Sequence, residues 1–355
     1  MTDIKPNRLL WIDILRGLAI LFMVPANLST LWDASHPMWF RLVGSFAAPS
    51  FILLSTAMVC FNSGRHSLKY YIERGIMILL VGMMIDMFLW KIMPFTSYDI
   101  LYFIGLSLPI AYLFRNVPSK TLLLLTIIFF IMAPVAQQIF GYHEKSLEIE
   151  MATFHLPAFG RVLQSMFVDG WFPIIPWIGL SFFSIVLFRR LFNEKPLQMS
   201  HLFLIGGSIS IVGFFFLFLP NHFFANIANG GIIENREGYS EIFYRPTIAF
   251  MVTAIGVFML LICLAQFFAK FKLTSAIGFF GKYSLFIYIL HQVIGNKIIS
   301  VYFQSKGEES ITNGVEFFYA VCFTFICIII CCQLIEFAKK FRRPQSAFLQ
   351  MLIGK

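Results

Sequence analysis

WIDILRGLAILFMVPANLSTLWDASH, residues 11–36, joins a hydrophobic run long enough to cross a membrane to polar residues at both of its ends. A membrane-spanning helix needs about 20 mostly apolar residues. Asp13 and Arg16 lie near the start of the run, and Asn27 and His36 lie at its end. On a helix, Arg16 and Asn27 share one face, within about 20° of each other and about 16 Å apart along the axis. Since ionisable groups at membrane depth usually face a bundle interior or a wet cavity, this polar face predicts a site inside a helix bundle.

The rest of the chain is as hydrophobic as this stretch. Of its 355 residues, 59% are hydrophobic and 13% are charged, and the mean hydropathy is +0.79. These values lie outside the range of soluble globular domains. The sequence therefore predicts an all-α integral membrane protein, a single domain over 1–355 built as a bundle of about ten transmembrane helices. The predicted helices are 9–31, 38–62, 70–92, 98–115, 119–139, 171–192, 200–220, 245–269, 282–303 and 313–338.

Lys and Arg gather on one side of this predicted topology. Assigning the N-terminus, every second loop and the C-terminus to one side collects most of the 27 basic residues there. By the positive-inside rule that side is cytoplasmic, so both termini are predicted to be cytoplasmic and the number of helices to be even. The net charge of +9 then reflects topology, and no nucleic-acid partner is expected. Most acidic residues, Glu241 among them, fall in outer loops, of which 140–170 and 221–244 are the longest, and most are interpreted as solvated.

The cysteines and the first helix also fit a membrane domain. The six cysteines lie inside predicted helices, so a disulfide framework is not expected. Cys327, Cys331 and Cys332 are interpreted as small packing residues rather than metal ligands, and no metal is expected. The first helix lacks the pattern of a removable signal peptide and is interpreted as a retained anchor. Membrane lipid is thus an expected partner.

Further polar residues lie at membrane depth in other predicted helices. His291 and Gln292, in GKYSLFIYILHQVIG (281–295), lie about nine residues into their helix and near mid-membrane, at a rise of about 1.5 Å per residue. Asp86 lies at similar depth in another helix. Pro25 would disturb the first helix, and the backbone groups that it frees need protein or cavity water as partners. Several polar groups in one bundle favour a functional site.

The residues alone leave a purely structural interpretation open. Asp13 and Arg16 would then form an interfacial ion pair that anchors the first helix. Asn27 would make a hydrogen bond between helices.

Several strings resemble one enzyme family. IDILRGLAILFMVPAN (12–27), followed by His36 and by GSFAAPSFILLSTAM (44–58), is similar to the start of the catalytic domain of heparan-α-glucosaminide N-acetyltransferases and their bacterial relatives. FPIIPWIGLSFF (172–183) and GKYSLFIYILHQ (281–292) resemble later parts of that family in the expected order. The resemblance implies a transmembrane acyltransferase that moves an acetyl group from cytoplasmic acetyl-CoA to a glucosamine-type amino sugar on the far side of the membrane.

The resemblance also implies roles for individual residues. It makes His36 the catalytic histidine and Asn27 a contributor to the site. Two departures leave the acceptor open: Ser45 stands where the family has an acidic residue, and the stretch 99–108 lacks an expected Gln-Arg pair.

The donor side of the proposed reaction needs cations for the phosphates of coenzyme A. Arg16 would attract a phosphate at the cytoplasmic mouth, with Asp13 beside it on the same face. Lys282 and Arg74 would assist, since clusters of Lys and Arg are usual phosphate partners. These four are the candidate donor-binding residues.

The chemistry needs a proton acceptor and a donor for the developing oxyanion. A histidine can take the acceptor's proton near neutral pH, and His36 is hypothesised as this general base in a direct transfer. A transiently acetylated His36 is the alternative. The Asn27 amide can donate to the carbonyl oxygen of the thioester. His291 is the third catalytic candidate, and it would hold the thioester, relay the proton or simply pack.

Other functions stay open on the sequence alone. An O-acyltransferase of cell-surface glycans would share much of the motif. A multi-pass transporter would show interrupted helices in two related halves, and no such symmetry is visible. A non-catalytic glycan-binding protein with the same fold is a third alternative. The expected location is the cytoplasmic (inner) membrane of a bacterial cell, and the oligomeric state is open, with a homodimer as one option.

Overall fold

The computed structural model describes residues 9–143, 147, 149–151, 159–192, 197–218, 240–271, 274–341, 346, 349 and 350. Within these residues the regular structure is helical, and the extended pairings are two isolated bridges. The all-α prediction is therefore confirmed for the described part of the chain. In order, the segments are α1 (Leu10–Leu28), η1 (Ser29–Leu31), α2 (Met38–Ser45), α3 (Ala47–Asn62), α4 (Leu68–Ile85), η2 (Asp86–Trp90), α5 (Ile100–Phe114), α6 (Ser119–Phe140), α7 (Phe159–Gln164), η3 (Ser165–Asp169), α8 (Ile174–Leu191), α9 (Met199–Leu217), α10 (Ile248–Phe268), α11 (Ser275–Lys282), α12 (Ser284–Val293), η5 (Ile294–Ile299), α13 (Ser300–Ser305) and α14 (Gly314–Phe341).

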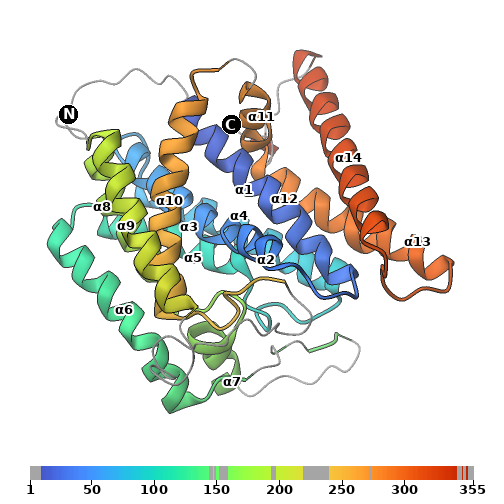
Figure 1. Cartoon of the computed structure of the whole chain (residues 1–355), viewed down its shortest axis with the longest axis horizontal. Coiled ribbons are helices and arrows are strands. Elements are labelled where there is room, and N and C mark those ends of the chain that lie inside the picture. Colours follow the sequence, from blue (N-terminus) through green and yellow to red (C-terminus); the bar gives the residue numbers. More distant parts are fainter. Residues whose placement is uncertain are drawn as a thin grey trace.

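Eight segments of the described chain are long and apolar enough to cross a membrane, which makes this a multi-pass membrane protein. They are Leu10–Leu31, Met38–Asn62, Ser119–Phe140, Ile174–Leu191, Met199–Leu217, Ile248–Phe268, Ser284–Ser305 and Gly314–Phe341. The other two predicted spans also form helices. One is α4, which η2 continues, and the other is the shorter α5. α1 begins and α14 ends on the same side of the bundle (Figure 1).

The two long loops that the sequence predicts are described only in part. Residues 221–239 of the second loop lie outside the described residues, as do 144–146, 148 and 152–158 of the first. The described remainder of the first loop contains α7 and η3. All six cysteines are free thiols.

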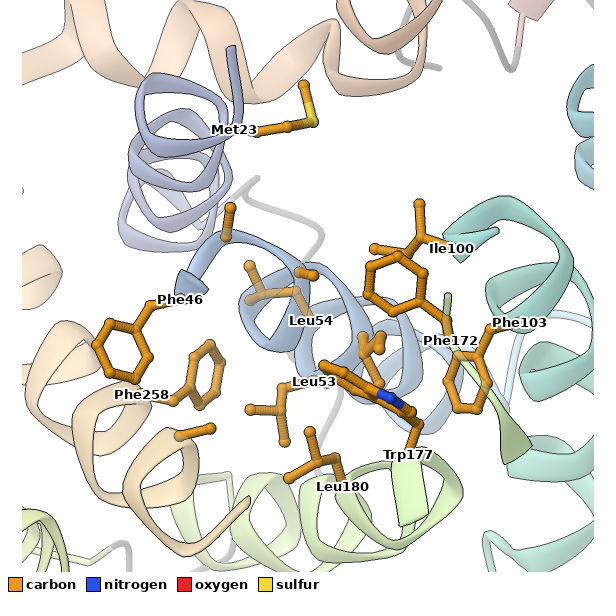
Figure 2. Close-up of a cluster of buried hydrophobic side chains, with 14 of the residues drawn as sticks. Met23, Phe46, Leu53, Leu54, Ile100, Phe103, Phe172, Trp177, Leu180 and Phe258 are labelled. Carbon is orange, nitrogen blue, oxygen red and sulfur yellow. The ribbon is translucent and has the colours of Figure 1, made fainter. Parts of the chain in front are cut away.

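The packed centre of the bundle forms around α3. Figure 2 shows Leu53 and Leu54 of α3 among side chains from neighbouring helices, including Trp177 and Leu180 of α8 and Phe258 of α10. These five side chains are almost fully buried. In lipid, such close van der Waals packing is the main attraction between helices. α14 and α6 lie at opposite edges of the bundle, with α1, α3 and α12 between them in the view of Figure 1.

α1 and α11 approach each other backbone to backbone. A Cβ atom on Gly17 would lie 2.0 Å from the carbonyl oxygen of Ile277, and one on Gly281 would lie 1.9 Å from the carbonyl oxygen of Asp13. Glycine at these two positions allows the contact, as small residues do between membrane helices. The contact places the turn of α1 that carries Arg16 beside the end of α11.

Gly17→Ala is expected to destabilise the protein by about 1–3 kcal/mol, because the added methyl group meets backbone atoms that cannot move aside. The measurement is the apparent midpoint of thermal unfolding in detergent. Gly207→Ala on α9 is the matched control, since a methyl group added there would meet nothing within 4 Å. Equal midpoints for the two variants would contradict the close α1–α11 contact.

Candidate functional site

Two cavities lie inside the bundle and share part of their lining. The first, called the Arg16 cavity, has a volume of about 460 Å³. The second, called the Asn27 cavity, has a volume of about 320 Å³. Phe51, Ile100 and Tyr288 line both cavities. These three residues therefore form the junction between them.

The Arg16 cavity is lined by cations. Arg16, Arg74 and Lys282 contribute to its wall, so three of the four predicted donor-binding residues meet there. The Tyr70 hydroxyl accepts a hydrogen bond of 3.1 Å from Nη1 of Arg74, and the ring of His66 stacks on Tyr70 at 3.9 Å between centroids. Among the described residues, no Asp or Glu lines this cavity. Its charge therefore suits a phosphate-bearing ligand.

Asp13 contacts Arg16 but does not line the Arg16 cavity. Its carboxylate lies 3.6 Å from the guanidinium of Arg16, and the residue is 6% exposed. It lines neither cavity. The prediction that Asp13 contacts the donor directly is thus not supported by its position, and any effect on a ligand has to act through Arg16. The sequence missed this because helical spacing gives a face but not the depth of a cavity along it.

Asn27 and His291 meet in the Asn27 cavity. The amide nitrogen of Asn27 lies 2.9 Å from Nε2 of His291, and Nδ1 of His291 lies 3.0 Å from the carbonyl oxygen of Ile287. A carbonyl only accepts hydrogen bonds, so the ring proton resides on Nδ1 and Nε2 accepts from the amide. The structure thus joins two predicted site residues from opposite ends of the chain.

The charged lining of the Asn27 cavity is acidic. Asp99 and Glu241 contribute carboxylates, whereas no Lys or Arg is among the described residues that line it. Asp99 accepts a hydrogen bond of 2.6 Å from the hydroxyl of Tyr288. The two cavities are therefore of opposite charge. In the described part of the chain no group of three or more His, Cys, Asp or Glu is placed to hold a metal ion.

Glu241 is held in this cavity by contacts of its neighbours with α2. Nε of Arg41 donates to the carbonyl oxygen of Ser240 at 2.9 Å, and the backbone N–H of Ile242 donates to Oγ of Ser45 at 2.8 Å. Glu241 is 4% exposed as a result. Burial raises its pKa to about 7, although nearby hydrogen bonds and the charge of Arg41 act in the opposite direction.

Glu241 is an exception to the interpretation that most acidic loop residues are solvated. The segment Ile242–Tyr244 is buried with it, and the carboxylate faces the Asn27 cavity instead of bulk water. The signal was present in the sequence, because three large apolar residues directly after a lone carboxylate are unusual in an exposed loop. Hydropathy over a helix-length window cannot detect a short segment of this kind.

His36 lies outside both cavities. It follows η1, and its ring packs edge-on to Trp32 at 5.1 Å and stacks on Phe40 at 5.8 Å between centroids. Both ring nitrogens are shielded from solvent. Burial lowers the pKa of His36; a backbone hydrogen bond at Ser29 acts against this, and the charge of Arg41 adds to it. The structure therefore does not bring His36 together with Asn27 and His291.

Asp86 also lies apart from the cavities. It is 1% exposed and accepts a hydrogen bond of 2.5 Å from the hydroxyl of Tyr102. This contact between η2 and α5 gives Asp86 a structural role in the described fold.

A comparison with protein families identifies the first part of the chain. Residues 8–213, more than half of the 355, match the family model described as heparan-alpha-glucosaminide N-acetyltransferase, catalytic. The match includes Asn27 and His36, whereas Glu241 and the stretch 281–292 lie beyond it. A search of curated proteins found no match.

Proposed function

Since the chain belongs to the heparan-alpha-glucosaminide N-acetyltransferase catalytic family, we propose that it is a membrane acetyltransferase. In this proposal it moves an acetyl group from cytoplasmic acetyl-CoA to an amino-sugar acceptor on the outer face of the cell membrane. The observation that carries this proposal is the pair of cavities of opposite charge that share one junction. The donor is an anion and the acceptor amine is a cation, so each substrate has a cavity of complementary charge. Both cavities draw on elements from α1 to α12, which supports one catalytic domain over 1–355.

Acetyl-CoA is the ligand that the Arg16 cavity suits. Arg16, Arg74 and Lys282 would bind its phosphates, and the pantetheine arm would carry the thioester to the junction. Placing the reacting carbonyl beside the acceptor turns a bimolecular step into a nearly unimolecular one, which is a large part of the catalytic effect.

Asn27 is the residue that we propose to stabilise the transition state. As the acceptor attacks, the carbonyl oxygen of the thioester becomes negative and needs a donor. One N–H of the Asn27 amide is directed at His291, which fixes the orientation of the amide and leaves its second N–H for the substrate. His291 is then a positioning residue.

The role of His36 stays a proposal from the family resemblance. Its ring packs between Trp32 and Phe40 and outside the Asn27 cavity. For His36 to act as the base or to become acetylated, residues 32–37 would have to carry the ring towards Asn27.

The acceptor class follows from the charge of the Asn27 cavity. A site lined by Asp99 and Glu241 attracts an ammonium group and gains nothing from a neutral hydroxyl. The charge therefore favours N-acylation over O-acylation of a glycan. A single transported cargo would have to suit a basic and an acidic cavity in turn, which disfavours the transporter alternative.

Arg16→Ala is expected to weaken acetyl-CoA binding about tenfold, because a hydrogen bond to a charged group contributes about 1.5–3 kcal/mol and each 1.4 kcal/mol is tenfold in affinity. The measurement is calorimetry on the detergent-purified protein. Lys120→Ala is the control, since Lys120 is exposed and lines neither cavity. A wild type that binds no acetyl-CoA at millimolar ligand, or that transfers no radiolabelled acetyl to glucosamine, would refute the proposed function.

A further inference from the structure

Glu241 provides a carboxylate that the catalytic assignment above does not use. We propose that Glu241 is the general base that takes the proton which the acceptor's amino group must lose before it attacks the thioester. This inference rests on the proposed function and adds a catalytic residue that lies beyond the part of the chain matched by the family model.

The position of Glu241 suits a base that acts on the acceptor. Glu241 lines the same cavity as Asn27, which we assign to the carbonyl oxygen. A base has to lie on the acceptor's side of that carbonyl, and the Asn27 cavity is the acidic one of the two. The anchoring of Ser240 by Arg41 and of Ile242 by Ser45 holds the carboxylate in place.

The carboxylate of Glu241 is less engaged by other side chains than the other titratable groups of the Asn27 cavity. The partners of the Glu241 carboxylate are the Ser240 hydroxyl, which donates over a long distance of 3.4 Å, and the backbone N–H groups of Ser240 and Glu241, so no side chain from another element donates a short hydrogen bond to it among the described contacts. By contrast, Asp99 accepts the hydroxyl proton of Tyr288 at 2.6 Å. In His291 one nitrogen donates to Ile287 and the other accepts from Asn27. Glu241 is therefore the carboxylate of this cavity that is best placed to accept a proton from a ligand.

The charged and titratable groups around Glu241 support its role as the general base. Arg41 acts on it from α2, and Asp99 and His291 line the same cavity from the start of α5 and from α12. Burial raises the pKa of Glu241 to about 7, so the carboxylate is a far stronger base than an exposed one. An effective base has a pKa near the working pH.

In the proposed step the acceptor loses two protons, one to Glu241 and one to the leaving thiolate. The acceptor arrives as an ammonium ion, and the Glu241 carboxylate removes one proton to leave the neutral amine. The nitrogen lone pair forms the new bond to the acetyl carbon, and the carbonyl oxygen becomes negative and accepts a hydrogen bond from Asn27. The carbon–sulfur bond breaks when the carbonyl double bond re-forms. Coenzyme A leaves as a thiolate and takes the second proton from nitrogen, which gives the N-acetyl product and a free thiol. Glu241 then returns its proton to water.

Glu241→Gln is expected to lower acetyl transfer to glucosamine by about a hundredfold, the lower end of what a general base contributes. Acetyl-CoA binding by calorimetry should stay unchanged, because Glu241 does not line the Arg16 cavity. In wild type kcat/KM should fall as the pH drops through about 7, because the carboxylate is then protonated. Glu309→Gln, an exposed acidic residue, is the matched control and should behave as wild type.

An assay with a second acceptor substrate distinguishes a role of Glu241 as the base from a purely structural role. An aminooxy sugar is already neutral near pH 7 and needs no base to deprotonate it first, so Glu241→Gln should impair its acetylation far less than that of glucosamine. Formate added to Glu241→Ala should restore part of the rate, since the truncated side chain leaves room for a small carboxylate. An equal loss with both acceptors, no rescue and an unaltered pH profile would overturn the assignment. If wild type itself transfers nothing, the proposed function fails instead.

Discussion

Asn27→Ala is expected to reduce the rate constant of acetyl transfer by up to about a thousandfold while acetyl-CoA binding stays the same. Removing a single oxyanion donor costs about 10²–10³ in rate, because the donor acts only as charge develops in the transition state. The measurement is kcat for radiolabelled acetyl transfer, alongside the dissociation constant of acetyl-CoA by calorimetry.

The rate loss expected for Asn27→Ala depends on the contact between Asn27 and His291. If His291 only orients the amide, the double variant Asn27→Ala/His291→Ala should be no slower than Asn27→Ala, since residues that act as a unit are not additive. Asn313→Ala, an exposed asparagine at the start of α14, is the matched control. Transfer by Asn27→Ala at the wild-type rate would remove Asn27 from the mechanism, and additive losses would give His291 a role of its own.

Ile100→Trp is expected to lower transfer at least about a hundredfold by blocking the junction between the cavities, since misplacing reacting groups by about 1 Å can cost that much. Ile100 lies at the first turn of α5, next to the centre of the bundle (Figure 2), and it lines both cavities. A larger ring there fills the path along which the thioester reaches Asn27. The phosphates still bind Arg16 and Arg74, so the dissociation constant of coenzyme A should change little.

The Ile100→Trp experiment has two controls: a variant with a smaller side chain at the same position, and a binding measurement that shows whether Ile100→Trp still folds. Ile100→Val keeps the path open and should transfer at close to the wild-type rate. Unchanged coenzyme A binding in Ile100→Trp shows that the bundle still folds. If Ile100→Trp binds coenzyme A and transfers acetyl normally, the donor does not pass this junction.

The sequence by itself determined the class of the protein and the face of α1 that matters. The length of an apolar run predicts a membrane-spanning helix, because in lipid the backbone N–H and C=O groups must form their hydrogen bonds within the protein and a helix does this within one segment. Helical periodicity predicted that Arg16 and Asn27 share a face, and the structure places one in each cavity. The family resemblance was also confirmed over 8–213. All of these signals are local in sequence.

Only the tertiary structure decided which residues share a cavity. Glu241 lies in the Asn27 cavity because its neighbours Ser240 and Ile242 form hydrogen bonds with Arg41 and Ser45, which are far away in sequence. Asp13 turned out to lie behind Arg16, and His36 lies against aromatic rings instead of in the cavity. The physical reason is that periodicity specifies a direction around one helix, whereas the position of a loop and the depth of a cavity depend on how several helices pack.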